Sequence, residues 1–69
     1  MDFSEQVFSE FRRRIESGQN EGLAKAFNIS DFPNATKEDV SDFCAMGYAQ
    51  KMYYGNFSLT KSGIEEALK

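Results

Sequence analysis

The sequence has no histidine and no tryptophan, and it has only one cysteine and one proline in 69 residues. A lone cysteine, Cys44, excludes an internal disulfide, and the common zinc-ligand sets cannot be assembled without histidine. The usual cysteine–histidine catalytic pair is excluded for the same reason. We therefore expect no metal site, no cofactor and no enzymatic activity. Cys44 is expected to serve as a small buried apolar side chain.

Long apolar runs and a positive charge excess are also missing. No apolar stretch approaches the roughly 18–20 residues of a membrane span, and the first residues lack the basic start and apolar core of a secretory signal. The net charge is −3, whereas domains that bind nucleic acid usually carry a positive excess. These features predict one cytoplasmic domain over residues 1–69 with no membrane contact.

Aromatic residues are abundant instead, with seven Phe and three Tyr. Each buries about 150–250 Å², so a few of them can fill a small core. Because so short a chain is near the lower size limit for folding alone, its stability must come from this core, helped by any self-association. Phe43 is predicted to lie at the centre of the core.

Apolar residues over 3–15 recur at the spacing of one helix face, with Asp2 as the N-cap and Gly18 as the stop. A shorter second helix is predicted after Asn20, with Leu23 and Phe27 on one face.

A third helix opens at Thr36, with Asp39 completing a capping box, and ends at Gly47. Its predicted inner stripe is Val40, Phe43 and Cys44.

A change of period after Gly47 predicts a hairpin. Residues 48–54 alternate in character as a strand does, Gly55-Asn56 is typical of a two-residue type II′ turn, and residues 57–59 form the returning strand. Neighbouring side chains on a strand face opposite ways, so either Tyr53 or Tyr54 is expected to point outward.

Thr60 caps a closing helix in which Gly63 is expected to allow close approach to the hairpin. The inward residues of this helix are predicted to be Ile64, Ala67 and Leu68. The predicted fold is therefore mainly α with a β-hairpin: three helices, a two-stranded hairpin and a closing helix.

This order resembles a winged helix-turn-helix domain of the small bacterial or phage type. Leu23–Ser30 is similar to the first helix of the helix-turn-helix unit, and Val40–Ala49 resembles the end of a recognition helix running into the wing. Phe57–Ile64 resembles the second wing strand and the start of the closing helix. The resemblance covers residues 20–69, with residues 3–17 as the first helix, and it implies DNA binding through the third helix and wing.

The outward face of the third helix departs from that expectation. It is predicted to carry Lys37, Glu38, Ser41, Asp42 and Ala45. Two carboxylates against one cation would meet the DNA phosphates as like charge. We therefore predict a regulatory or adaptor module that contacts another protein, including a basic one, through this face and the wing-tip residues Tyr53, Tyr54 and Asn56. The alternative is a winged-helix DNA-binding regulator that dimerises.

The one basic cluster is Arg12, Arg13 and Arg14. It could contact phosphate or an acidic partner. The favoured interpretation is a solvated helix face, in which Glu10 pairs with Arg14 and Arg12 with Glu16.

Overall fold

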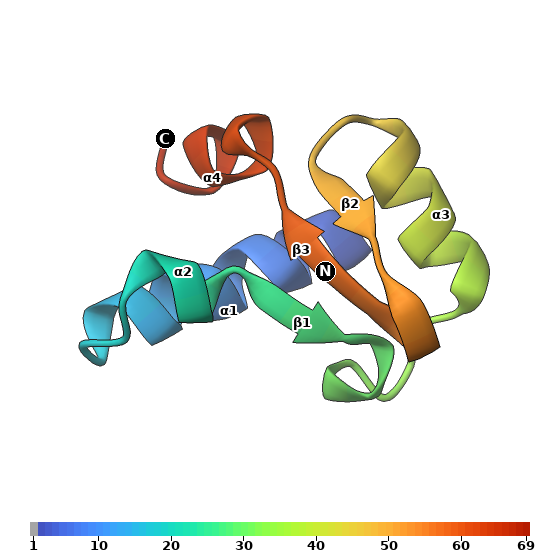
Figure 1. The fold of residues 1–69 in the computed structure, drawn as a ribbon, viewed down its shortest axis with the longest axis horizontal. Coiled ribbons are helices and arrows are strands. Elements are labelled where there is room, and N and C mark those ends of the chain that lie inside the picture. The colour runs from blue at the N-terminus through green and yellow to red at the C-terminus, as the bar shows by residue number, and fades with distance from the viewer. Residues whose placement is uncertain (1) are drawn as a thin grey trace.

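The computed structural model describes residues 2–69. It contains four α-helices, α1 (Phe3–Glu16), α2 (Glu21–Ala24), α3 (Lys37–Ala45) and α4 (Lys61–Ala67), and three strands, β1 (Ala26–Asn28), β2 (Ala49–Lys51) and β3 (Asn56–Leu59) (Figure 1). A short 3-10 turn occupies Ile29–Asp31, and a turn with positive φ at Tyr54 and Gly55 joins β2 to β3. The chain is thus mainly helical with a small antiparallel sheet, which agrees with the predicted class but adds a third strand.

The helices α1, α3 and α4 begin at their predicted caps. The Asp2 carboxylate accepts the Glu5 N–H at 2.8 Å, and the Thr60 hydroxyl accepts the Gly63 N–H at 3.2 Å. At α3 the capping box is reciprocal, because Thr36 Oγ1 accepts the Asp39 N–H while Asp39 Oδ2 accepts the Thr36 N–H. These bonds satisfy amide groups that a helix start leaves unpaired, so the local sequence fixes where each helix begins.

The predicted second helix is wrong beyond its first turn. Asn20 caps it as expected, but α2 is only four residues long and Leu23 is 65% exposed. Phe27 lies in β1, where it pairs with Phe57 of β3 and stacks on that ring at 5.6 Å between centroids. Cross-strand pairing and stacking outweigh the modest helical preference of residues 26–28.

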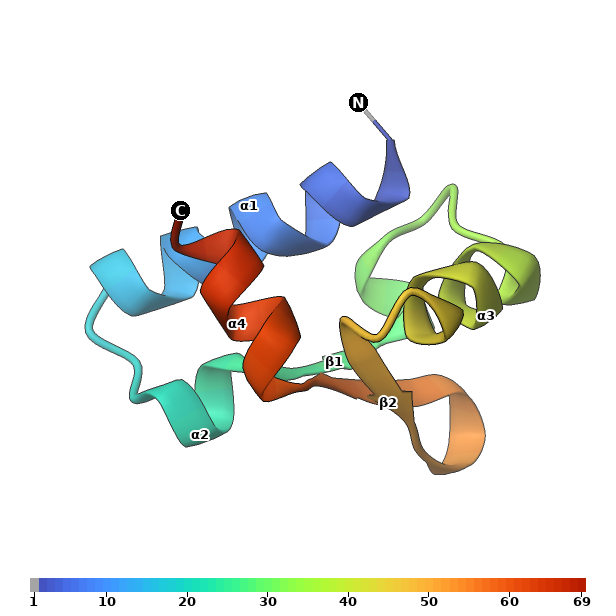
Figure 2. The same ribbon diagram turned by 90° about the horizontal axis from the view of Figure 1, so that it is seen from above.

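The sheet has the order β1-β3-β2, and both pairings are antiparallel. Phe57 is opposite Phe27 on one side and Lys51 on the other, so these three share a face. Seen from above, α1 lies along that side of the sheet while α3 packs beside β2 (Figure 2). The hairpin β2–β3 projects away from α1 at the α3 end of the molecule.

Phenylalanine fills the core. Six of the seven Phe are buried, and the seventh, Phe3, packs against them. Phe43 is 1% exposed, and its ring is within 6.3 Å, between centroids, of four others: Phe3, Phe8, Tyr48 and Phe57. Its predicted central position is confirmed.

The closing helix approaches the sheet closely at Gly63, as predicted. A Cβ placed on Gly63 would overlap the Tyr48 carbonyl, so only glycine fits. Ile64 packs against the core and Ala67 is buried within it, but Leu68 is exposed, contrary to prediction. The helix ends at Ala67, so Leu68 lies at its C-cap, beyond the inward stripe.

Candidate interaction surface at the hairpin tip and α3

The hairpin turns one residue earlier than predicted. Tyr54 and Gly55 have φ of 58° and 77°, and the Asn56 N–H donates to the Tyr53 carbonyl. Positive φ at both central residues is the requirement of a type I′ turn, so the predicted type II′ turn at Gly55-Asn56 is wrong. Such turns strongly favour Asn-Gly or Asp-Gly. Here a tyrosine occupies the position at which asparagine is preferred.

Asn28 of β1 holds this turn in place. Its side-chain amide donates to the Tyr54 carbonyl at 3.0 Å and to Asn56 Oδ1 at 2.7 Å, while its Oδ1 accepts the Ser30 N–H. This clamp explains the shift in the turn, because it fixes Asn56 as the first residue of β3. Sequence reasoning missed Asn28, since its role depends on a strand pairing that local patterns did not indicate.

Both tip tyrosines point into solvent. Tyr53 is 82% exposed and Tyr54 is 95% exposed, and the two rings lie 6.4 Å apart between centroids. Met52, just before the turn, is also largely exposed. Only one of the two was predicted to point outward, but both lie in the turn, where the alternation of a strand does not apply. The structure thus brings two aromatic side chains and a methionine together at one projecting end.

The exposed face of α3 is divided into two rows. Lys37 and Ser41 are four residues apart and lie on the hairpin side, where Lys51 Nζ of β2 donates to Ser41 Oγ at 3.1 Å. Glu38 and Asp42 form the next row, about 100° further around the helix. All four α3 residues are exposed as predicted, but the acidic row is turned away from the hairpin.

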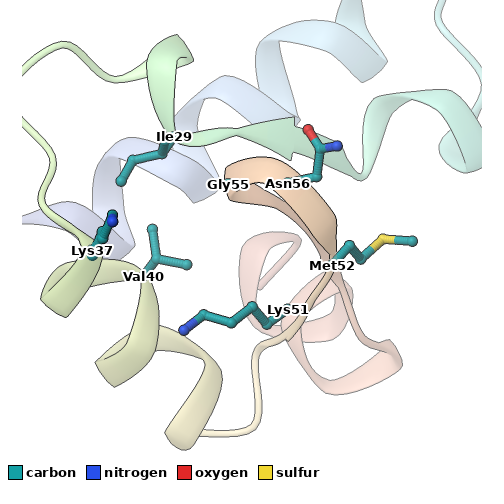
Figure 3. Close-up of a pocket in the computed structure, with 7 residues that line it drawn as sticks. All are labelled: Ile29, Lys37, Val40, Lys51, Met52, Gly55 and Asn56. Carbon is teal, nitrogen blue, oxygen red and sulfur yellow. The ribbon is translucent and has the colours of Figure 1, made fainter.

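A hollow of about 220 Å³ separates α3 from the hairpin. Ile29 and the backbone at Gly55 adjoin each other at its edge and Val40 of α3 lies across from them, with the Lys37 and Lys51 side chains beside it (Figure 3). The remaining lining residues are Met52 and Asn56. Of the predicted partner-binding residues, Lys37 and Asn56 line this hollow directly.

The three arginines of α1 are engaged within the domain. Arg12 donates to the Ala67 carbonyl at 2.8 Å and pairs with Glu5, rather than with Glu16 as predicted. Arg14 donates to the Ala24 and Ala26 carbonyls and lies 4.4 Å above the Phe27 ring centre. These two side chains therefore hold α1 against α4 and β1, and only Arg13 lies on a solvated face.

Glu10 connects Arg13 and Arg14. It accepts from Arg13 at 2.7 Å and from Arg14 at 3.0 Å, so the predicted Glu10–Arg14 pair is confirmed. The hydrogen bond from Arg13, followed by that from Arg14, lowers the pKa of Glu10 from 4.5 to about 2, although partial burial acts in the opposite direction. The carboxylate is thus held ionised inside the domain's own contacts.

Cys44 is half-buried on α3, and burial raises the pKa of its thiol. Within residues 2–69, no three cysteine or carboxylate side chains gather closely enough to hold a metal ion. In the same part of the chain, no helix combines the length and apolar character needed to cross a bilayer.

Compared with known proteins, the chain matches no family model, and neither a curated protein nor a solved structure is significantly similar to it. The candidate surface therefore rests on its own geometry: an exposed aromatic tip, a two-row helix face and a hollow between them.

Proposed function

We propose that this domain is a small, non-enzymatic regulatory or adaptor module of winged-helix type. It contacts another protein through the hairpin tip and the adjoining face of α3. The observation that carries the proposal is the exposure of Tyr53 and Tyr54, 82% and 95%, in a domain whose other aromatic side chains pack in or against the core.

The conformation of the tip lowers the stability of the fold by more than its contacts raise it. A tyrosine with φ of 58° is in the left-handed region, which disfavours side-chain-bearing residues by about 1–2 kcal/mol. Its ring gains no burial in return, since Tyr54 is 95% exposed. Tyrosine is enriched at the energetic centres of protein interfaces because it combines apolar area with a polar end. A binding role accounts for a residue that the fold does not need.

The winged-helix assignment is supported by the placement of α3 beside the β2–β3 hairpin, the positions of a recognition helix and a wing. Two features argue against DNA as the partner. The expected first helix of the helix-turn-helix unit, Leu23–Ser30, is a single turn followed by β1, so the element that crosses the DNA backbone in such domains is lacking. The exposed Glu38 and Asp42 add like charge toward phosphate.

Co-purification of the tagged domain from its native host, with nuclease treatment, tests the proposal. The parent should retain a protein partner after nuclease, and the double variant Tyr53→Ser with Tyr54→Asn should lose it. Asparagine suits the left-handed position, so this variant keeps the turn. Leu23→Ser is the matched control, because it removes an exposed apolar side chain from α2 and should retain the partner.

Two results would overturn the proposal. One is equal retention of partners by the parent and the tyrosine double variant. The other is tight, salt-sensitive binding of mixed-sequence duplex DNA by the parent in a gel-shift titration, which would favour the dimeric DNA-binding regulator instead. Analytical ultracentrifugation of both proteins determines whether a second copy of this chain is the partner.

A further inference from the structure

The hollow between α3 and the hairpin combines apolar walls with cationic edges. Val40 is buried at its base, and Ile29 contributes a half-buried wall. The backbone at Gly55 adjoins Ile29 and continues this wall, since a Cβ at Gly55 would come within 2.9 Å of Ile29 Cγ2. A hollow of about 220 Å³ with this lining accommodates one large apolar side chain.

Two lysines border the hollow with positive charge that the domain does not neutralise. Among residues 2–69, Lys37 has no ion-pair partner, and Lys51 donates only to the neutral hydroxyl of Ser41. The nearby acidic residues of α3, Glu38 and Asp42, lie in the other row of the helix. All the arginines of α1, by contrast, are paired with carboxylates of the domain.

We infer that this hollow binds an acidic peptide segment of a partner protein. It would take one apolar side chain between Val40 and the adjoining Ile29 and Gly55, while carboxylates beside that side chain pair with Lys37 and Lys51. The inference rests on the proposed function and specifies the chemistry of the partner. Charge complementarity selects the occupant, because both cations flank the apolar opening and no carboxylate lines it.

Other polymers suit this site less well. A basic segment would place its cations against Lys37 and Lys51. A nucleic-acid backbone would satisfy the two cations but would leave the apolar walls without an apolar partner, and it would pass the acidic row of α3. A peptide that alternates carboxylate and apolar side chains satisfies both features at once.

Fluorescence polarisation with labelled synthetic peptides tests the inference. The main probe is an eight-residue peptide with one central phenylalanine flanked on each side by two aspartates. Companion peptides replace the aspartates by asparagine or by lysine, or the phenylalanine by alanine. We expect the main probe to bind most tightly, and each companion to bind more weakly.

The double variant Lys37→Gln with Lys51→Gln should weaken binding of the main probe. Each exposed ion pair is worth about 0.2–1 kcal/mol, so the expected loss is about 1.4- to fivefold for each lysine. The matched control is Lys25→Gln with Lys61→Gln, which makes the same change in net charge away from the hollow and should bind like the parent. Nuclear magnetic resonance shifts on binding should concentrate at Ile29, Val40 and Gly55.

Equal weakening by the two double variants would overturn the inference, because the attraction would then be general and not local. Tighter binding of the lysine peptide or of duplex DNA than of the main probe would also overturn it. These failures are distinguishable from a failure of the proposed function. The latter is measured by partner capture with the tyrosine variants, whereas this test uses defined peptides and the lysine variants.

Discussion

The arginine cluster of α1 and the tyrosine tip of the hairpin are opposites in what they do for the fold. Arg14 is a charged residue whose side chain is only 16% exposed, and it contacts two backbone carbonyls, two carboxylates and the Phe27 ring. Tyr54 is an aromatic residue that is 95% exposed, and within residues 2–69 the one aromatic ring beside it is that of its neighbour Tyr53. From residue type alone, the arginine would be expected at the surface and the tyrosine in the interior.

After folding, the side chains that remain available to bind a partner lie at the hairpin tip and not in the arginine cluster. The arginines are engaged within the domain, because Arg12 and Arg14 donate to carbonyls at the ends of α4, α2 and β1. Both tyrosines are held through their backbone carbonyls, Tyr54 by the Asn28 side chain and Tyr53 by the Asn56 N–H. Their side chains are therefore positioned and free, which is what an interface residue requires.

The largest expected effect separates an aromatic residue that folds the domain from one that does not. Phe43→Ala should cost about 3–5 kcal/mol, as for other buried Phe, because its ring contacts four others. Domains of this size have little stability to spare, so the variant should be largely unfolded. Tyr53→Ser should change stability by about 0.5 kcal/mol or less. Urea denaturation followed by circular dichroism compares them, and similar midpoints would contradict the contrast.

A second comparison lies within the arginine cluster. Arg14→Met should destabilise by about 2 kcal/mol, because it removes hydrogen bonds to two carbonyls and the charge above Phe27. In a domain of 60–100 residues this corresponds to a loss of about 8–16 °C in melting temperature. Arg13→Met removes an exposed pair with Glu10 and should leave the melting temperature nearly unchanged. Equal shifts for the two variants would mean that the buried contacts of Arg14 add nothing.

Glu10 gives the cluster a pH dependence. Its pKa is about 2 in the folded domain and 4.5 ordinarily, so the ionised form is favoured by folding. The stabilisation is fully present above about pH 4.5 and is lost as the pH falls toward 2. Glu10→Gln should therefore be less stable than the parent at neutral pH by about 1 kcal/mol, after allowance for solvent screening. Thermal unfolding should show this difference closing below pH 4.5. A constant difference would disprove the linkage.

The parts of the fold that depend on nearby residues were predictable from the sequence. Helix starts are set within four residues by caps such as Thr36 with Asp39, and the inner face of α3 follows from the spacing of Val40 and Phe43. The strand β1 was not predictable in this way, because Phe27 becomes a strand residue only through Phe57, thirty positions later. Periodicity over so short a segment also fits a helix.

The candidate site was likewise predictable only where it depends on residues close together in the sequence. Exposure of Lys37, Glu38, Ser41 and Asp42 followed from helical spacing, but the hollow did not, since it depends on where the hairpin lies against α3. The turn was misplaced because Gly55-Asn56 satisfies a local preference that Asn28 overrides from another strand. Tyr54 therefore lies at the left-handed position of the turn, although its sequence neighbours favoured a strand.

The smallest expected effect on stability is a gain and not a loss. Tyr54→Asn creates the Asn-Gly pair that type I′ turns favour, and it relieves a tyrosine of its left-handed backbone at φ of 58°. No buried contact is lost, so the variant should be more stable than the parent by about 0.5–1 kcal/mol. If the tip is an interface, the same change should weaken partner capture. A variant that folds better and binds worse separates the two roles of the tip, which no core substitution can do. Urea midpoints measure the change in stability, and co-purification measures the change in partner binding. A Tyr54→Asn protein that is less stable than the parent would mean that the ring supports the fold, and the contrast with Arg14 would then fail.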